Sequence, residues 1–264
     1  MEKIIIEARK KAFSLFAGHR HSKKFGEGLN FEELREYQIG DNVKRIDYNV
    51  TAKKQKPYIK VFSEEKELNI VIVGIFDYKT YFGSSILKSE KMMEIIATLG
   101  FSGVKSDDKI SMFLYGKNNI LIKPTKNYKA ITGNLIKFNS EVRGVELNYK
   151  EILSKLMKIK KNSVVIIVSD FFFYDDIFKK LGAKFDTYAV VVRDKLEENP
   201  TLLNGLNIIN PLTNRSRIAD FDKSYKAKLL DNDSKLFHLF KKSNIKYQKI
   251  YTDEEILNLR RLFG

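Results

Sequence analysis

The chain has 264 residues, of which 43% are hydrophobic and 12% aromatic, so it is long and apolar enough to build a sizeable packed core. It contains no cysteine, which excludes disulfides and thiolate metal sites and fits a reducing compartment. The formal net charge of +15 raises a nucleic-acid hypothesis, but the basic residues are mostly lysines interleaved with acidic residues, so a solvated basic surface is the favoured interpretation.

The N-terminal segment has apolar residues at helical spacing from Ile4 to Phe16, followed by Gly18, which favours a helix end. It lacks the sustained apolar run and the cleavage site of a secretory signal. The most apolar stretch, from Leu68 to Phe76, is too short to cross a bilayer as a helix. We therefore expect a cytoplasmic protein without a membrane span.

Glycine turns, aromatic residues and charges dominate from Gly26 to Glu67. The stretch from Lys56 to Ser63 alternates in polarity as a half-buried strand does. We predict that residues 1–67 form an N-terminal helix and a small, mostly β module.

Residues 68–264 alternate between β-branched runs and amphipathic stretches. Strands are expected at 68–76, 110–115, 120–122, 163–168, 187–192 and 247–251. Helices are expected at 86–104, 128–138, 149–159, 175–181 and 224–242, with a last helix that starts at a capping box, Thr252-Asp-Glu-Glu255. This order predicts an α/β fold with a doubly wound, mostly parallel sheet.

Two of the clearest strands are followed by an aspartate, Asp77 in one case and Asp170 in the other. In doubly wound sheets, binding sites form beyond the carboxyl ends of the strands. Two carboxylates there suggest a site for a hard cation such as Mg²⁺. The alternative is that they cap helices or accept hydrogen bonds from loop amides, and spacing alone slightly favours it.

A long ordered motif precedes the first of these strands. It comprises Gly18-His-Arg-His-Ser22, Gly26-Glu-Gly28, Phe31-Glu-Glu-Leu-Arg-Glu-Tyr37, Gly40-Asp41, Arg45-Ile-Asp47, Tyr58-Ile-Lys-Val-Phe62 and Glu64-Glu65. The motif resembles the domain-of-unknown-function family fifty-eight. A weaker resemblance continues through Ser169-Asp170-Phe171 and from Tyr251 to Phe263.

The resemblance implies a von Willebrand factor A-like domain at residues 68–264, after the N-terminal module. It also implies association with MoxR-type AAA+ ATPases, which are thought to act as chaperones in the maturation of complexes. A client protein would then be the second partner.

In such domains a metal ion-dependent adhesion site combines an Asp-x-Ser-x-Ser loop, a threonine from a second loop and an aspartate from a third. Here the first loop reads Asp77-Tyr-Lys-Thr-Tyr81, so that Lys79 and Tyr81 replace the serines. The second loop has Val145 at the expected threonine position, followed by Glu146. Of the implied ligands, Asp77 and Asp170 remain.

Lysine offers three hydrogen-bond donors and no acceptor, and its charge repels a dication. We expect the Lys79 ammonium to lie between Asp77 and Asp170 and to neutralise them. We therefore predict no bound Mg²⁺ and no other cofactor, with weak metal binding by the two aspartates as the alternative. The predicted partner-binding surface consists of Asp77, Lys79, Tyr81, Val145, Glu146 and Asp170.

Within the N-terminal module, Arg35, Asp41, Arg45 and Asp47 resemble a set of ion pairs. We expect them to hold the module onto the main domain. Contact with a partner is the alternative.

The sequence contains no nucleophile elbow, phosphate-binding loop or zinc motif. The predicted function is therefore a non-enzymatic interaction module or adaptor that works with a MoxR-type ATPase and has a degenerate metal site. The alternative is a nucleic-acid-binding protein that uses its basic surface, for which affinity would fall steeply as salt rises.

Overall fold

The computed structural model describes residues 23–65, 67–139, 145–173 and 175–263, together with Ile4 and Ala8. The chain divides into two compact units: residues 18–67, and the remainder, which joins residues 1–17 to residues 68–264. Ile4 and Ala8 are helical, and the rest of the helix expected at residues 4–16 lies outside the described residues. We call the two parts the small unit and the large unit.

A six-stranded sheet forms the centre of the large unit, with the strand order β10-β7-β6-β3-β4-β5. Five strands are parallel, and the edge strand β5 runs antiparallel to β4. The strands are β3 (Asn69–Ile75), β4 (Lys109–Tyr115), β5 (Ile120–Thr125), β6 (Val164–Ser169), β7 (Asp186–Arg193) and β10 (Lys246–Tyr251). The predicted mixed α/β class and mostly parallel sheet are confirmed.

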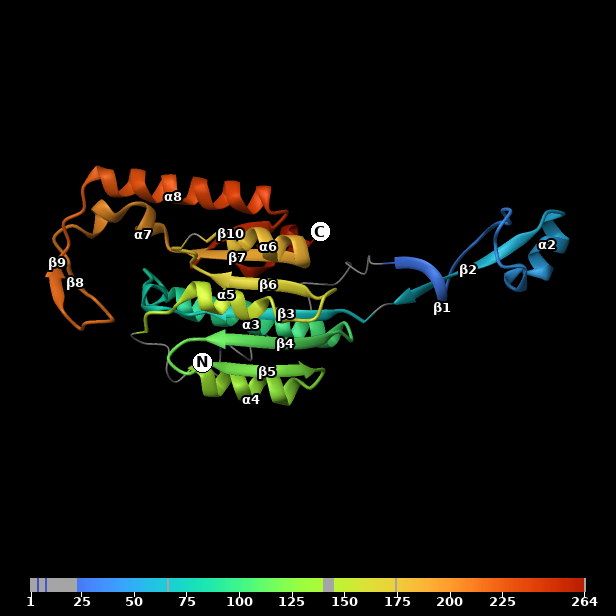
Figure 1. Cartoon of the computed structure of the whole chain (residues 1–264), viewed down its shortest axis with the longest axis horizontal. Coiled ribbons are helices and arrows are strands. Elements are labelled where there is room, and N and C mark those ends of the chain that lie inside the picture. The colour runs from blue at the N-terminus through green and yellow to red at the C-terminus, as the bar shows by residue number, and fades with distance from the viewer. Residues whose placement is uncertain are drawn as a thin grey trace. The chain divides into compact units, whose positions relative to one another are not determined.

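Helices cover both faces of this sheet (Figure 1). One face packs against α3 (Lys88–Lys105), α4 (Tyr128–Asn139), the 3-10 turn η4 (Ile256–Leu259) and α9 (Arg260–Phe263). The other packs against α5 (Tyr149–Leu156), α6 (Ile177–Lys184) and α8 (Lys223–Lys242). The chain leaves β3 toward β4 on one side and leaves β6 toward β7 on the other, so the carboxyl ends of the neighbouring strands β3 and β6 flank the point where the strand order reverses.

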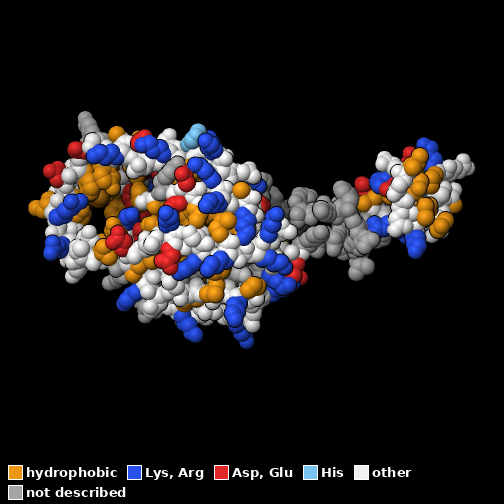
Figure 2. All heavy atoms as spheres, viewed as in Figure 1, with side chains coloured by type: hydrophobic (Ala, Val, Ile, Leu, Met, Phe, Trp, Pro, Cys, Tyr) orange, Lys and Arg blue, Asp and Glu red, His pale blue; other side chains and the backbone are white. Residues whose placement is uncertain are grey.

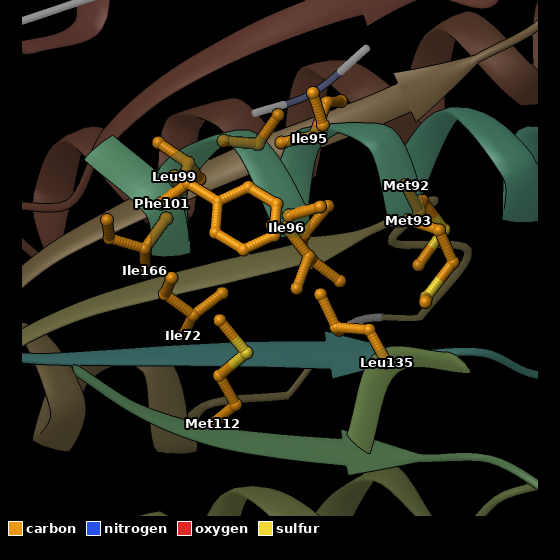
Figure 3. Packing of buried hydrophobic residues seen from close by; sticks show 14 of the residues in the cluster. Ile72, Met92, Met93, Ile95, Ile96, Leu99, Phe101, Met112, Leu135 and Ile166 are labelled. Carbon is orange, nitrogen blue, oxygen red and sulfur yellow. The ribbon is translucent and has the colours of Figure 1, made fainter. Parts of the chain in front are cut away.

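Helix α3 is the central helix of the first face, and sixteen of its 18 residues are buried. Its Ile96 and Phe101 lie over Ile72 of β3 and Ile166 of β6 (Figure 3). Gly74 of β3 permits this approach, since a Cβ there would lie 2.6 Å from the Ile96 Cδ1 atom. A larger residue at position 74 would therefore push α3 away from the sheet.

On the second face, aromatic rings fill the space between the sheet and the helices. Phe178 of α6 and Phe240 of α8 meet edge-to-face with ring centroids 5.2 Å apart, and Phe171 packs against both. Such pairs add about 0.5–1.5 kcal/mol beyond the apolar area that they bury. This packing fixes the chain just after Asp170.

A segment of mostly irregular structure links β7 to α8. It contains α7 (Lys195–Glu198), the 3-10 turn η3 (Pro200–Leu203) and a two-stranded hairpin of β8 (Asn207–Ile209) and β9 (Ser216–Ile218). Because it follows β7, it begins at the carboxyl edge of the sheet, and Figure 1 shows β8 and β9 beyond the arrowheads of β4 and β6. These elements could not be predicted from the sequence, since strands of three residues carry almost no periodic signal.

The small unit contains β1 (Lys23–Glu36) paired antiparallel with β2 (Tyr58–Glu65). Between them lie the 3-10 turn η1 (Val43–Arg45) and the helix α2 (Tyr48–Lys54). Asp47 caps α2 by accepting hydrogen bonds from the Asn49 and Val50 amides, both at 3.0 Å.

Several element bounds differ from the sequence predictions: α5 ends at Leu156 rather than at residue 159, and α6 spans Ile177–Lys184 rather than 175–181. Helix α3 begins at Lys88 rather than at residue 86. Thr252 does not cap the final helical segment, which begins at Ile256; its hydroxyl donates instead to the Asp194 carboxylate at 2.7 Å. Among the described residues, no helix is both long and apolar enough to cross a membrane.

Candidate functional site

Asp77 lies directly after β3, and its side chain is turned into the protein. The residue is 1% exposed. One carboxylate oxygen accepts a hydrogen bond from the Lys79 amide at 2.8 Å, and the other accepts one from the Tyr149 hydroxyl. Burial, and secondly the nearby charge of Asp170, raise the pKa of Asp77 to about 6.

Asp170 lies after the adjacent strand β6, and its partner is a fully buried lysine. The Lys88 Nζ atom is 3.1 Å from an Asp170 carboxylate oxygen, and both side chains are 0% exposed. Lys88 is the first residue of α3, so its side chain enters the carboxyl edge of the sheet from the helix N-terminus. The sequence gives no sign of this role for Lys88, because a charged residue at a helix start is usually solvated.

The Lys88 ammonium has a second carboxylate partner in α7. Its Nζ atom lies 2.5 Å from the Glu197 Oε1 atom. Burial raises the pKa of Glu197, whereas the charge of Lys88 acts in the opposite direction. One cation therefore bridges the β6 loop and the segment that follows β7.

A second buried cation, Arg193, completes this network. Its guanidinium donates to the main-chain carbonyl of Asp170 and to the Asp233 carboxylate, the latter at 2.6 Å. The Phe172 ring lies beneath it, 3.8 Å from the guanidinium carbon to the ring centroid, and the Lys88 Nζ atom is 4.8 Å from the same centroid. Both cations therefore lie within cation–π distance of one ring, which attracts each of them.

Asp194 ties three loops together at the same edge. Its carboxylate accepts hydrogen bonds from the Ser84 amide and hydroxyl, both at 2.9 Å, and from the Thr252 hydroxyl. Burial alone would raise the pKa of Asp194, but the hydrogen bonds from Thr252 and Ser84 lower it. The loop after β3 is therefore anchored to the loops after β7 and β10.

Lys79 takes a different position from the expected one. Its Nζ atom is 3.8 Å from an Asp77 carboxylate oxygen, and the side chain remains 34% exposed. It also lies near the rings of Tyr78 and Tyr149, at 5.6 and 5.9 Å from their centroids. Asp170 pairs instead with Lys88, so Lys79 pairs with one aspartate rather than lying between the two.

The remaining predicted residues of this surface belong to the loop after β3 and the segment before α5. The Val145 carbonyl accepts a hydrogen bond from the Tyr78 amide at 2.7 Å, which brings the two loops together through the main chain. Tyr81 is half-buried and Glu146 is exposed. Gly144, which precedes Val145, lies outside the described residues.

The chemistry of these residues does not fit a divalent cation. Mg²⁺ needs oxygen acceptors in an octahedral array. Here the groups directed at Asp77 and Asp170 are donors: the Tyr149 hydroxyl, the Lys79 amide and the Lys88 ammonium. The Thr80 hydroxyl donates to the Asp77 carbonyl at 2.7 Å, and no cluster of three or more His, Asp or Glu ligands occurs in the described parts of the chain.

In the small unit, Arg35 and Asp41 pair with each other. The guanidinium binds the carboxylate through two hydrogen bonds of 2.7 and 2.8 Å, and this pairing is the main reason that the pKa of Asp41 is lowered. Asp47 caps α2 and pairs with Lys60 at 3.1 Å. The contacts described for these residues lie within the small unit, and the expected role in holding the two units together stays a prediction.

Comparison with known families supplies the classification. A family model described as "Protein of unknown function DUF58" matches residues 33–223, which include most of the small unit, Asp77, Asp170 and Glu197. The chain belongs to this family. The match confirms the family resemblance that the motif from Gly18 to Glu65 indicated. The family description states no activity. No curated protein matches the chain.

Proposed function

We propose that this DUF58 protein is a non-enzymatic adaptor that works with a MoxR-type AAA+ ATPase and presents a client protein at the carboxyl edge of its sheet. The fold would be of von Willebrand factor A-like type, in a cytoplasmic protein. The main observation in its support is that the buried Lys88 ammonium pairs with Asp170 and Glu197. A von Willebrand factor A-like fold would hold its metal ion at this position. The edge then works as a protein surface without an ion.

The burial of the acidic groups supports a binding role over a catalytic one. A raised carboxyl pKa, such as that of Asp77, is often a mark of acid–base chemistry. However, Asp77 is 1% exposed and its two oxygens are already hydrogen-bonded to Lys79 and Tyr149. A substrate would have to displace these contacts before it reached the carboxylate.

Apolar side chains exposed at the same edge also support the proposal. Leu206, Ile209, Leu212 and Ile218 of the β8–β9 region are between 40% and 71% exposed, and we call them the hairpin surface. Figure 2 shows apolar side chains gathered at this end of the large unit. Exposed apolar side chains that cluster in this way commonly mark protein-binding sites.

The electrostatics around the hairpin surface favour a client with acidic residues. Arg215 and Arg217 are exposed, and neither forms an ion pair with a described residue. Lys79, one third exposed, adds a positive charge near Asp77. Complementary charge mainly raises the association rate and fixes orientation, while the apolar residues supply affinity.

The primary test is binding of the purified full chain to the MoxR-type ATPases of the same organism, measured by calorimetry. We expect a one-to-one contact per ATPase protomer, with a dissociation constant in the micromolar range or below. If the chain binds none of these ATPases, the proposal is wrong.

The client surface is tested with immobilised chain–ATPase complexes, by quantifying the cell proteins that they retain. Lys79→Glu and Ile218→Asp should lose proteins that the wild-type complex enriches, because the first reverses a charge at the edge and the second disrupts the hairpin surface. Lys129→Glu, an exposed change on α4, is the matched control. If all complexes retain the same cell proteins in equal amounts, the carboxyl edge of the sheet does not bind the client.

A further inference from the structure

The family motif in the small unit builds a rigid turn that displays one isoleucine. Ile39 is 102% exposed, the highest exposure among the large hydrophobic side chains of the described residues. It lies between Gln38 and Gly40, and the Asp41 amide donates to the Gln38 carbonyl at 3.0 Å to close the turn. Gly40 has φ +104°, a conformation that a side chain at that position would strain.

Several hydrogen bonds hold this turn in place. Arg35 of β1 binds the Asp41 carboxylate through two hydrogen bonds, and the same carboxylate accepts the Gln38 amide at 2.8 Å. The Tyr37 amide donates to the Pro57 carbonyl at 2.8 Å, which joins the start of the turn to the segment before β2. The paired Arg35 and Asp41 of the motif therefore hold the backbone that carries Ile39.

Two other apolar side chains follow closely in the chain. Val43 of η1 is 57% exposed and Tyr48 at the start of α2 is 75% exposed. Figure 2 shows apolar side chains gathered on one side of the small unit. We call Ile39, Val43 and Tyr48 the apolar tip.

Basic residues occur in the same short elements as most of the apolar tip, η1 and α2. Lys44, Lys53 and Lys54 are exposed, and none of them forms an ion pair with a described residue. Lys56 and Lys60, by contrast, pair with Glu36 and Asp47. The charge that remains unmatched at this end of the small unit is therefore positive.

We propose that the apolar tip is the contact through which this chain binds the ATPase, inserting Ile39 into an apolar pocket that is rimmed by aspartate and glutamate. This inference rests on the proposed function and adds a second surface to it. One unit would then bind the ATPase while the other presents the client.

A protein pocket suits this geometry better than a lipid surface does. A fluid bilayer requires no fixed direction for an inserted side chain, whereas a pocket gains affinity when the side chain is held in place before binding. The tip also has three large apolar side chains rather than the extended apolar face of an interfacial helix. Anchors of this kind typically carry most of the energy of a protein interface.

The test measures the affinity of the full chain and its variants for the ATPase. Ile39→Asp should weaken binding at least tenfold, and Ile39→Leu should keep wild-type affinity, because it retains the apolar volume. The triple change Lys44→Glu, Lys53→Glu and Lys54→Glu should weaken binding and flatten its salt dependence. Leu121→Asp, an exposed apolar position on β5, is the matched control and should have no effect.

The outcomes separate the inference from the proposed function. If the wild type binds the ATPase and Ile39→Asp binds equally well, the inference is overturned and the adaptor function stands. If the wild type binds no such ATPase, both fail. A last experiment measures sedimentation of the chain with phosphatidylglycerol vesicles. If the wild type binds the vesicles and Ile39→Asp does not, the tip binds a membrane and the inference is overturned.

Discussion

The ion pair between Lys88 and Asp170 spans 3.1 Å, and neither side chain is accessible to solvent. It joins the first residue of α3 to the loop after β6, at the point of the sheet where ligands bind in doubly wound folds. Glu197 brings the segment after β7 to the same ammonium. A side chain of the protein itself therefore supplies the positive charge at this edge.

Lys88→Met should lower the free energy of unfolding by about 3–5 kcal/mol, because Asp170 and Glu197 would keep buried charge without a cation. Urea unfolding at neutral pH measures this loss. Lys129→Met, an exposed change, should stay within about 0.5 kcal/mol of the wild type. A loss below 1 kcal/mol for Lys88→Met would show that the ammonium is not a buried partner of the two carboxylates.

The double variant Lys88→Met, Asp170→Asn should recover part of this stability, since one of the stranded charges is removed with the lysine. The two effects should be non-additive by at least about 1 kcal/mol in a double-mutant cycle. Strict additivity would mean that the two side chains do not interact.

Asp77→Asn should change the pH dependence of stability. The folded-state pKa of about 6 lies above the unfolded value of 3.8, so the stability that protonated Asp77 contributes is full below about pH 4 and is lost as pH rises through 6. The variant removes this loss, and its stability relative to the wild type should increase by about 2 kcal/mol between pH 4.5 and pH 7.5. Unfolding curves at these two pH values measure the difference, with the exposed change Asp176→Asn as the control. A constant offset between Asp77→Asn and the wild type would contradict the assignment.

Arg193→Lys should destabilise the protein by about 2–4 kcal/mol despite the conserved charge. Lysine cannot stack flat on Phe172 while it donates to both the Asp170 carbonyl and the Asp233 carboxylate. Thermal unfolding monitors the change, and the exposed Arg215→Lys should leave the melting temperature unaltered. Equal melting temperatures for both variants would rule out a structural role for the planar guanidinium.

The strands of the large sheet could be predicted because a strand buried on both faces reads as a continuous apolar run, as in Val71–Ile75. The position of Asp77 and Asp170 at one edge followed from the parallel topology alone. The prediction that Lys79 lies between Asp77 and Asp170 was wrong, because its side chain is partly exposed near Tyr149 and Lys88 pairs with Asp170.

Lys88 and Glu197 could not be paired from the sequence. They are more than a hundred residues apart, and their contact depends on α7, a four-residue helix with no periodic signal. One local clue exists: Asp194 and Glu197 have the spacing of a capping box, which the structure contains. The exposure of Ile39 could not be predicted either, since the motif around it indicates a turn but not the direction of its side chain.

The most direct test of the account is thermal unfolding of the wild-type chain with excess Mg²⁺ and with a chelator. Because Lys88 already neutralises the edge, we expect the same melting temperature in both conditions. A protein that binds the ion would gain about 2.7 kcal/mol at a hundredfold excess over its dissociation constant. A saturable rise in melting temperature with Mg²⁺, reversed by the chelator and abolished in Asp170→Asn, would contradict the claim that a lysine has taken the place of the metal ion.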